Sequence, residues 1–367
     1  MKFTCERADL QNAVGIAARA ASPRSPNPTM EGILVEAKAG GLKLTGYDLK
    51  KGIHTSIDAN VTEEGDVILS ARIFSGIVNS LPEGEVTLST QQQNVTIRCE
   101  SAEFHIIGTD AADYPELPEL EQPEGVSIPQ NLLGRMIRQT IFAVSDNESR
   151  PVYTGEKFEV SEGNLTLVAV DGYRLSLRRE KVEGMQNDIS FIVPGNALSD
   201  VEKLCADTEE AVTISVSPKH IGFTIGRTVL ISRRLEGEFL NYRTTVPNSF
   251  NTHAVVDRAR LQHTVERVSL LIDDRIKNPI RCTVGDGGIH ISSITTQGKA
   301  EDICPAECDQ GKVEIGFNNR YLLDALKAAP AEELQICLNT GTSPCVITPT
   351  DGSDAFLYMI LPVRLKA

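Results

Sequence analysis

One short pattern recurs three times in this chain, at intervals of about one third of its length. Residues 166–175 read T-L-V-A-V-D-G-Y-R-L, in which a β-forming run meets turn chemistry at Asp171-Gly172 and a second alternating run follows. The pattern appears earlier as L-K-L-T-G-Y-D-L-K-K-G-I at 42–53, and more loosely as I-H-I-S-S-I-T-T-Q-G at 289–298. Asp48 and Asp171 lie 123 positions apart, and Asp171 and Thr296 lie 125 apart. Such a period predicts three similar units in succession.

Each third carries two helical stretches separated by runs of alternating strands. We expect helices within Arg7–Arg19, Val67–Gly84, Ile128–Val144, Phe191–Leu204, Asp257–Leu270 and Val313–Pro330, the second, fourth and sixth of them after a leading strand. The acidic, proline-rich stretch Asp113–Gly125 reads as a linker. The predicted fold is α+β: three repeated domains of antiparallel sheet with two helices each, at 1–122, 126–250 and 251–367, the helices covering one sheet face.

Composition limits the class of protein further. The apolar fraction of 41% can fill several cores, and these must be aliphatic because tryptophan is absent and aromatic residues make up only 5%. No apolar run approaches the length of a membrane span, and no signal-peptide core follows Met1, so we expect a cytoplasmic protein. The eight cysteines are scattered, which favours thiols over a disulfide framework, and even Cys304 and Cys308 do not predict a metal site.

Repeated modules placed end to end form either an open solenoid or a closed ring. Three domains leave two free ends with exposed sheet edges, which are an aggregation hazard unless they are paired. A second copy joined head to tail would pair both ends and close a ring.

Several motifs together resemble one known family. They are M-K-F-T at 1–4, L-T-G-Y-D-L at 44–49, V-D-G-Y-R-L at 170–175, I-V-P at 192–194, V-E-I-G-F-N at 313–318 and L-P-V-R-L at 361–365. In this order they cover the whole chain and resemble the bacterial DNA polymerase III beta subunit, the family of sliding clamps.

The resemblance implies a head-to-tail homodimeric ring with helices inside and sheets outside, which encircles duplex DNA without sequence preference. It implies a processivity subunit with no catalysis of its own and no cofactor. The implied partners are the DNA polymerase III alpha subunit, an ATP-hydrolysing clamp loader, and other polymerases or repair proteins that bind through short linear motifs. The implied location is the cytoplasm, at the nucleoid, with no membrane.

Charge supports a DNA-lined opening. The whole chain carries −14, yet the six predicted helices sum to a positive charge, so a basic helical layer would lie inside an acidic body. The residues expected to face DNA are Arg24, Arg135, Arg138, Arg150, Lys203, Arg258, Arg260 and Arg320. Each of them can also be read as an ordinary exposed helix charge. Gly195 and Asn196 depart from the family, which often has basic residues there, and the nearby Asp200 and Glu202 put the grip on DNA in question.

A hydrophobic cleft between the middle and last domains is the family's site for partner peptides. The matching residues here are Tyr153, Val170, Gly172, Tyr173, Arg174, Leu175, Leu240, Thr342, Pro344, Met359, Leu361, Pro362, Val363 and Arg364. Leu175, Leu240, Met359 and Leu361 would supply apolar walls, and Arg174 and Arg364 would rim the cleft. The alternative to a binding cleft is that Leu175 belongs to the hydrophobic core and that L-P-V-R-L is simply the last strand.

The family's dimer contact matches Phe104, Leu270 and Leu271, with Arg72 as a candidate partner for Glu301 or Asp302. Phe104 could instead pack inside its own domain.

Two rival classes stay open at this point. An enzyme could be built on Asp171, Tyr173, Arg174 and His290, but no nucleotide-binding, nucleophile or zinc signature accompanies them. A monomeric β-rich scaffold that binds proteins and no DNA is the other, and the mass in solution separates it from a dimer.

Overall fold

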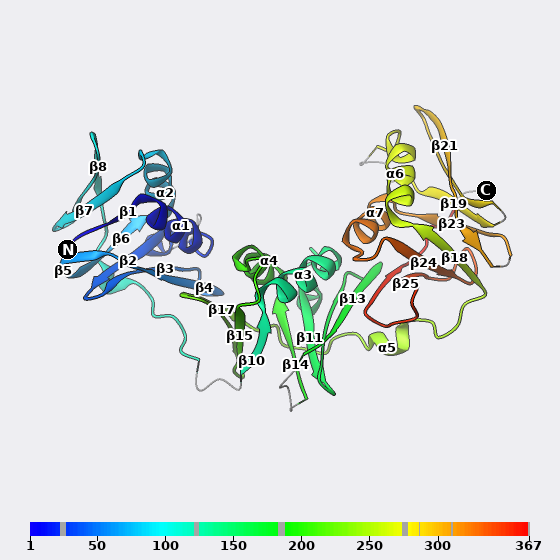
Figure 1. The fold of residues 1–367 in the computed structure, drawn as a ribbon, viewed down its shortest axis with the longest axis horizontal. Helices are drawn as coiled ribbons and strands as arrows, with labels where there is room; N and C mark the ends of the chain where they lie inside the picture. Colours follow the sequence, from blue (N-terminus) through cyan, green and yellow to red (C-terminus); the bar gives the residue numbers. More distant parts are fainter. Residues whose placement is uncertain are drawn as a thin grey trace. The chain divides into compact units, whose positions relative to one another are not determined.

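The computed structural model describes residues 1–22, 27–120, 125–182, 188–273, 278–285, 287–309 and 311–365. The chain divides into two compact units, one of Met1–Gly134 with Asp200–Arg234 and the other of Arg135–Ser199 with Leu235–Ala367 (Figure 1). Each unit contains two antiparallel sheets, and helices pack against them.

The first unit holds a five-stranded sheet, called sheet A, and an eight-stranded sheet, called sheet B. Sheet A has the order β5-β1-β7-β8-β9, with bounds Asn60–Glu63, Lys2–Glu6, Glu85–Gln91, Asn94–Cys99 and Ala102–Ile107. Sheet B has the order β10-β15-β16-β17-β4-β3-β2-β6, with bounds Gly125–Pro129, Ala211–Val216, His220–Ile225, Thr228–Arg233, Lys51–Ile57, Gly41–Tyr47, Gly32–Lys38 and Gly65–Ser70.

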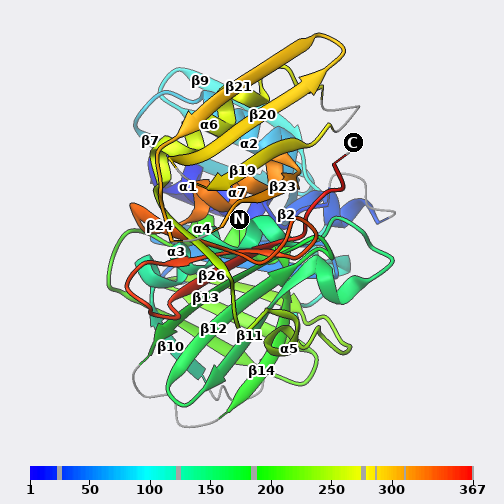
Figure 2. The same ribbon diagram turned by 90° about the vertical axis from the view of Figure 1, so that its right-hand side faces the viewer.

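The second unit holds a nine-stranded sheet, called sheet C, and a four-stranded sheet, called sheet D (Figure 2). Sheet C has the order β14-β11-β12-β13-β26-β25-β24-β18-β22, with bounds Ile189–Pro194, Gly155–Ser161, Asn164–Val170, Arg174–Lys181, Phe356–Ile360, Cys345–Pro349, Glu333–Leu338, Thr252–Asp257 and Glu307–Cys308. Sheet D has the order β21-β20-β19-β23, with bounds Gly298–Cys304, Gly288–Thr295, Ile280–Gly285 and Val313–Phe317.

Seven α-helices and four 3₁₀ turns lie among the described residues. The helices are α1 Arg7–Ala18, α2 Ala71–Ser80, α3 Gln130–Thr140, α4 Gly195–Leu204, α5 Tyr242–Thr245, α6 Arg258–Ser269 and α7 Asn319–Ala328. The 3₁₀ turns are η1 Pro28–Glu31, η2 Ala111–Asp113, η3 Ile141–Ala143 and η4 Pro151–Thr154.

The helices form where apolar residues recur at helical spacing behind a suitable cap. In α1 the buried residues Leu10, Ala13, Val14 and Ala17 make one continuous face, as a 3.6-residue period requires. Helix α6 begins after Asp257, whose carboxylate accepts a hydrogen bond from Arg260 N at 2.7 Å. The carboxamide of Asn318 caps α7 in the same way. Side-chain oxygens at these positions satisfy amide groups that the helix itself leaves unpaired.

The six predicted helices are present, with corrected bounds. The third begins at Gln130 and not at 128, because Ile128 and Pro129 end a strand that pairs with β15. Its last turn, Ile141–Ala143, tightens to 3₁₀. A seventh helix, the short α5 at Tyr242–Thr245, was not predicted. The final strand β26 ends at Ile360, so L-P-V-R-L lies beyond it. All eight cysteines are free thiols.

Two of the sheets continue through a junction between strands that are far apart in sequence. In sheet B, β4 pairs with β17 in a register that places Leu230 opposite Ile53; this pairing is called the first joint. In sheet C, β13 pairs with β26 and Tyr358 lies opposite Ser176; this pairing is called the second joint.

The two joints are internal copies of each other. Gly46, Ala169 and Ser293 lie opposite Ile53, Ser176 and Ala300 in the preceding hairpins, so β4, β13 and β21 are equivalent strands. The hairpins that supply the other strand of each joint can be compared in the same way. In these hairpins Phe104, Leu230 and Tyr358 lie opposite Ile97, Phe223 and Ile347, so β9, β17 and β26 are also equivalent strands. Only β9 and β21 of these six strands are sheet edges in the described part of the chain.

Candidate functional site

An apolar cluster covers one face of sheet C at the second joint. Ser176 donates its hydroxyl to Thr140 O on the helix side at 2.7 Å, so its neighbours Leu175 and Leu177 point to the opposite face. That face is the apolar cluster, whose buried members are Val168, Leu175, Leu177, Tyr242, Cys337, Val346 and Met359, with Phe239, Leu240, Val246, Phe250 and Leu357 packed against them. The members come from the five neighbouring strands β12, β13, β26, β25 and β24, together with the segment that follows β17.

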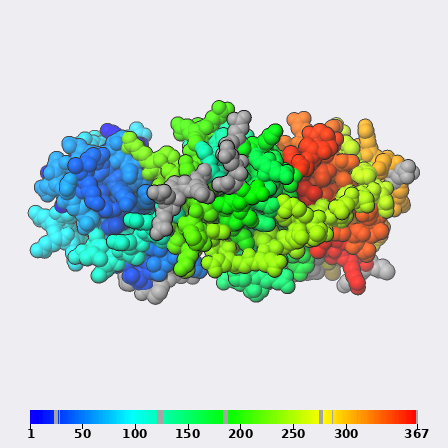
Figure 3. Space-filling model, turned by 90° about the horizontal axis from the view of Figure 1, so that it is seen from below, coloured from blue at the N-terminus to red at the C-terminus, as the bar shows by residue number. Residues whose placement is uncertain are grey.

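The segment 239–250 forms the outer wall of the apolar cluster, and the helix α5 within it lies against the sheet (Figure 2). Seen from below, the same segment lies at the surface in yellow-green (Figure 3). Tyr242 anchors it, since this side chain is only 4% exposed and its hydroxyl donates to Glu159 at 3.3 Å. Burial raises the pKa of Glu159, but hydrogen bonds from Arg243 and Lys157 outweigh it and leave that pKa below the ordinary value. The wall is therefore fixed to β11 by an ionised, doubly paired carboxylate.

Arg174 points away from the apolar cluster. Its guanidinium donates to Asp171 at 2.9 Å and to Asp324 of α7, and it lies 4.4 Å from the centre of the Tyr321 ring. Tyr173 stacks on Tyr321 with ring centres 6.3 Å apart and is 63% exposed. Both residues line a separate hollow of about 500 Å³ beside the start of α7. Arg174 therefore ties β13 to α7, which is a different place from the predicted pocket rim.

The first joint contains a corresponding ion pair. Lys51, at the start of β4, donates to Asp200 of α4, and Arg19 Nη1 lies 3.6 Å from the other carboxylate oxygen. Lys51 and Arg174 are separated by 123 residues, and Asp200 and Asp324 by 124, so the two ion pairs are equivalent by the internal repeat. Asp200 is only 8% exposed. Its charge is thus paired within the first unit by Lys51 and Arg19.

The two sheet edges β9 and β21 carry exposed apolar side chains nearby. Ile107 at the end of β9 is 77% exposed, and Ile73 of α2 is also exposed. In the other unit, Ile303 of β21 and Leu270, which follows α6, are exposed, the latter by 81%. Large apolar side chains left open beside an unpaired strand are typical of an interaction surface.

The cations expected to face DNA are mostly exposed on helices. Arg135 and Arg138 of α3, Lys203 of α4, Arg260 of α6 and Arg320 of α7 are exposed, as is Arg150 before η4. Arg258 is half-buried, because its guanidinium donates to Ala331 O at 3.1 Å and joins the start of α6 to the segment after α7. Arg24 lies outside the described residues.

Comparison with known proteins agrees with the three-domain order. Models of the N-terminal, central and C-terminal domains of the DNA polymerase III beta subunit match residues 1–118, 127–241 and 243–364. A beta sliding clamp of Halalkalibacterium halodurans is 34% identical over 99% of this chain and 100% of its own length.

The chain belongs to the DNA polymerase III beta subunit family, the beta sliding clamps.

Solved sliding clamps have the same fold. The DNA polymerase sliding clamp of Bacillus subtilis superposes with a TM-score of 0.95 at 31% identity, over 100% of both chains. The sliding clamp of Pseudomonas aeruginosa bound to griselimycin superposes with a TM-score of 0.93 at 27% identity, also over 100% of both chains. As a member of this family, the chain is a processivity subunit of DNA replication and not a catalytic one. Among the described residues, no helix is long and apolar enough to cross a membrane.

The structure distributes the predicted sliding-clamp pocket residues over several places in the second unit. Leu175, Leu240 and Met359 meet in the apolar cluster. Tyr153 packs edge-on against Phe239 at 5.8 Å, beside the cluster's wall. Val170 is buried in β12, Gly172 has the positive φ of 94° that its turn needs, and Thr342 bonds within its own loop. Pro344 directly precedes β25.

The described residues after β26 make backbone hydrogen bonds that the sequence did not indicate. Leu361 N donates to Tyr173 O, and Val363 N donates to Gly316 O, both at 2.8 Å. Pro362 is half-buried between them, and Val363 and Arg364 are exposed. Sequence reasoning missed several members of the cluster, including Leu177, Val346 and Tyr242. Strand alternation from Leu175 could have found Leu177; nothing local marks Val346.

Proposed function

We propose that this chain forms a head-to-tail homodimeric ring that encircles duplex DNA and tethers DNA polymerases for replication and repair. The observation that carries the proposal is the matched pair of free edges. The chain uses one kind of joint twice, at β4–β17 and β13–β26, and leaves the equivalent strands β9 and β21 as edges. Pairing β9 of one copy with β21 of another repeats that joint, and two such pairings close the assembly.

The two internal joints also supply a register for this contact. Leu230 lies opposite Ile53 and Tyr358 lies opposite Ser176, and both pairs predict Phe104 opposite Ala300. Phe104 is half-buried against the core of its own unit, so it would stabilise β9 at the proposed contact between the two copies. Leu270, Leu271 and Arg72 would lie beside this contact. Within the chain Asp302 already pairs with Arg267, and Glu301 with Lys299, so Arg72 would join an existing network.

Contact with DNA would be made through phosphates. Exposed arginines and a lysine on α3, α4, α6 and α7 supply cations, while the chain as a whole is strongly acidic at −14. Such contacts position a duplex without reading its sequence, which sliding requires. The expected grip is weak and salt-dependent, and retention comes from enclosure.

Partner proteins would dock on the apolar cluster. Replicative and repair polymerases and the clamp loader would each dock a short linear motif beside the segment 239–250, at the border of the apolar cluster. The adaptable Met359 and the aliphatic Leu175 and Leu240 suit varied apolar peptide side chains. Work at the nucleoid, in the cytoplasm, follows from these partners.

Topological retention tests the proposal. The protein is loaded by a clamp loader onto a nicked circle, which is then either kept circular or cut once. We expect retention on the circle and loss from the linear product, because a ring slides off a free end. Equal retention on both DNAs would show ordinary adhesion and would contradict the ring.

A further inference from the structure

Sheets B and D carry position-matched hollows on corresponding faces. In sheet B, Leu34 lies opposite Thr45, Glu36 opposite Lys43, and Thr45 opposite His54. In sheet D the corresponding pairs are Arg281 with Ser292, Thr283 with His290, and Ser292 with Glu301. The first set lines a hollow of about 810 Å³, and the second lines a hollow of about 1110 Å³. The internal repeat therefore places one surface in two copies.

In sheet B, the chain lays its own acidic linker across this surface. Residues 114–120, Y-P-E-L-P-E-L, form a wall of the hollow. The hydroxyl of Tyr114 donates to Thr45 O at 3.1 Å, and Leu117 packs with Tyr47 and Ile68. Leu117 and Leu120 lie directly over Gly52 and Gly222, where a side chain on either glycine would collide with them. The surface thus accepts an extended segment with regularly spaced leucines.

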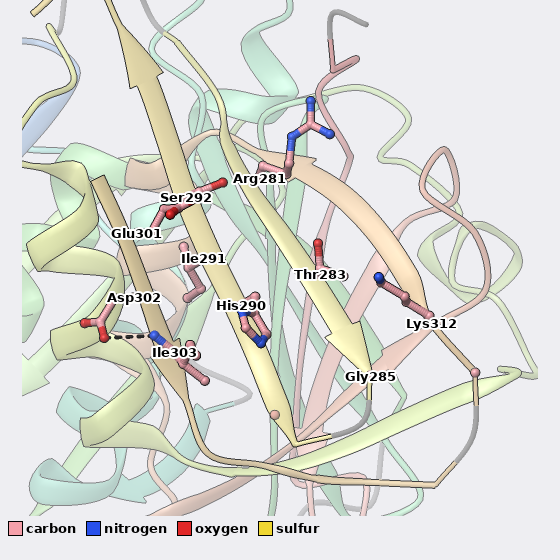
Figure 4. Close-up of a pocket in the computed structure, with 12 residues that line it drawn as sticks. Arg281, Thr283, Gly285, His290, Ile291, Ser292, Glu301, Asp302, Ile303 and Lys312 are labelled. Carbon is pink, nitrogen blue, oxygen red and sulfur yellow. Dashed lines mark hydrogen bonds between the residues drawn. The ribbon is translucent and has the colours of Figure 1, made fainter. Parts of the chain in front are cut away.

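In sheet D, no linker segment of the described residues crosses the matching hollow, which is called the open hollow. Among the described residues, only β19, β20, β21 and the pair Gly311-Lys312 line it (Figure 4). The segment after β26 begins with the same backbone hydrogen bond as the linker of sheet B. Val363 N donates to Gly316 O, as Thr109 N donates to Ile68 O. The described residues of this segment do not line the hollow.

The side chains that line the open hollow carry two positive and two negative charges, Arg281 and Lys312 against Glu301 and Asp302. Among the described residues, Lys312 is the one of these four without an ion pair, so it is the charge that favours an acidic occupant of the hollow. The two carboxylates are already engaged, Glu301 by Lys299 and Asp302 by Arg267 at 2.7 Å. Arg281 and the exposed Lys312 both line the hollow (Figure 4). Arg281 also pairs with the exposed Glu314 at 2.6 Å. Arg281 of sheet D occupies the position of the apolar Leu34 in sheet B. A segment bound to sheet D would therefore place a carboxylate, and not an apolar side chain, at this position.

We propose that the open hollow of sheet D is a second docking surface, distinct from the apolar cluster, for an extended acidic segment of a partner protein. The segment lies across β19–β21 as residues 114–120 lie across sheet B, with a carboxylate on Arg281 and another on Lys312. This proposal uses one unit of one chain and does not require the ring.

A labelled peptide with the sequence of residues 113–120, D-Y-P-E-L-P-E-L, is the probe. Fluorescence anisotropy on the full chain should show saturable binding. We expect Lys312→Glu combined with Arg281→Gln to weaken binding by roughly tenfold or more, because two charge-assisted contacts are lost. Replacing the three acidic residues of the peptide with their amides should weaken binding to the same extent.

Matched variants locate the binding. Lys327→Glu, on α7 of the same unit, controls for general charge and should leave affinity unchanged. The proposal is overturned if binding is absent, or if Lys312→Glu with Arg281→Gln has no effect. It is also overturned if Leu240→Ala abolishes binding, which places the peptide in the apolar cluster, or if Lys43→Glu does, which means exchange with the resident linker. Retention on circular DNA is measured separately, so either idea can fail alone.

Discussion

Glu156 is a carboxylic acid buried completely between α3 and β11. It is 0% exposed, one of its oxygens has no partner, and the other lies 3.1 Å from the hydroxyl of Thr140. Burial raises the pKa of Glu156 well above its ordinary value, and the Thr140 hydrogen bond only partly offsets this. Thr140 Oγ1 also lies 2.9 Å from Met136 O, so its single proton is shared between that carbonyl and the Glu156 carboxylate.

Replacement of Glu156 by Gln should stabilise the protein, increasingly so at higher pH. Because the folded-state pKa is raised, the stability linked to Glu156 is fully present below about 4.5, its unfolded value, and is lost as pH rises toward the folded value. Gln does not titrate, so we expect a gain of about 0.5–2 kcal/mol near pH 8 and little change near pH 4, below the unfolded pKa. Thermal unfolding at both pH values measures this, and a constant difference would contradict the assignment.

Single residues also show where sequence reasoning reaches its limit. The repeat predicted a turn at both Asp48 and Asp171, and both carboxylates do accept hydrogen bonds from the amides of the turn residues that follow. The sequence could not tell which side of the sheet Arg174 faces. That direction depends on Asp324 and Tyr321, which lie about 150 positions away. Arg258 is among the residues predicted to face DNA, and the sequence did not indicate that its guanidinium also donates to Ala331 O after α7. Long-range partners of this kind leave no local pattern.

At the scale of elements, each joint combines a strand pairing with an ion pair from its first residue to a helix. Breaking the pair at the first joint should weaken the first unit, because Lys51 and Asp200 are both largely buried. We expect Lys51→Met to cost about 3 kcal/mol, since it leaves a buried carboxylate with Arg19 alone at 3.6 Å. Denaturant unfolding measures the loss of stability, and hydrogen exchange of the β4 amides shows whether the loss lies at the first joint.

A double replacement separates charge from packing at this joint. Lys51→Met with Asp200→Leu removes both charges and should recover most of the stability, because neither ion is then left unpaired. If the double variant is as unstable as the single one, the ion pair is not the cause.

The wall of the apolar cluster should control peptide affinity. Leu240→Ala removes a half-buried side chain from segment 239–250 while the sheet residues stay in place. We expect about a tenfold loss of affinity for a polymerase-derived peptide, in the range of a typical contact that contributes strongly to binding. Ile294→Ala, at an exposed apolar side chain of the same unit, is the control and should change nothing. Isothermal titration measures both, and equal affinities would exclude the cluster.

The sequence predicted the elements better than it predicted their pairing. Alternation and helical spacing gave the six helices and most strands, because both patterns are local. The pairing of β1 with β7 across 80 residues, and of β4 with β17, is not encoded in either pattern. The apolar cluster was found only in part for the same reason, since Cys337, Val346 and Phe250 join it through the sheet and not through a motif.

At the scale of the whole molecule, the register of the proposed dimer is open to a direct check. Both internal joints predict Glu103 of β9 opposite Glu301 of β21, because Val229 lies opposite His54 and Leu357 opposite Leu177. Glu103→Cys with Glu301→Cys should therefore crosslink two copies on oxidation, since residues directly opposite on antiparallel strands are close enough for a disulfide. Non-reducing electrophoresis measures the dimer band.

A shifted pair tests the register itself. Glu103→Cys with Lys299→Cys moves one thiol by two residues on the same strand face and should crosslink much less. Equal yields from both pairs would mean a sliding or different contact, and a monomer on a sizing column at micromolar concentration would favour the monomeric scaffold.

The shared sheets have a consequence for any attempt to divide the chain. A fragment that stops at residue 120 keeps β4 but removes β17, and exposes the backbone amides and carbonyls of Lys51–Thr55 that β17 now satisfies. Unpaired edge strands of this kind form hydrogen bonds with other chains and promote aggregation. Excised domains should therefore be sticky and poorly behaved on their own, so the smallest well-behaved piece of this protein is far larger than its sequence repeat.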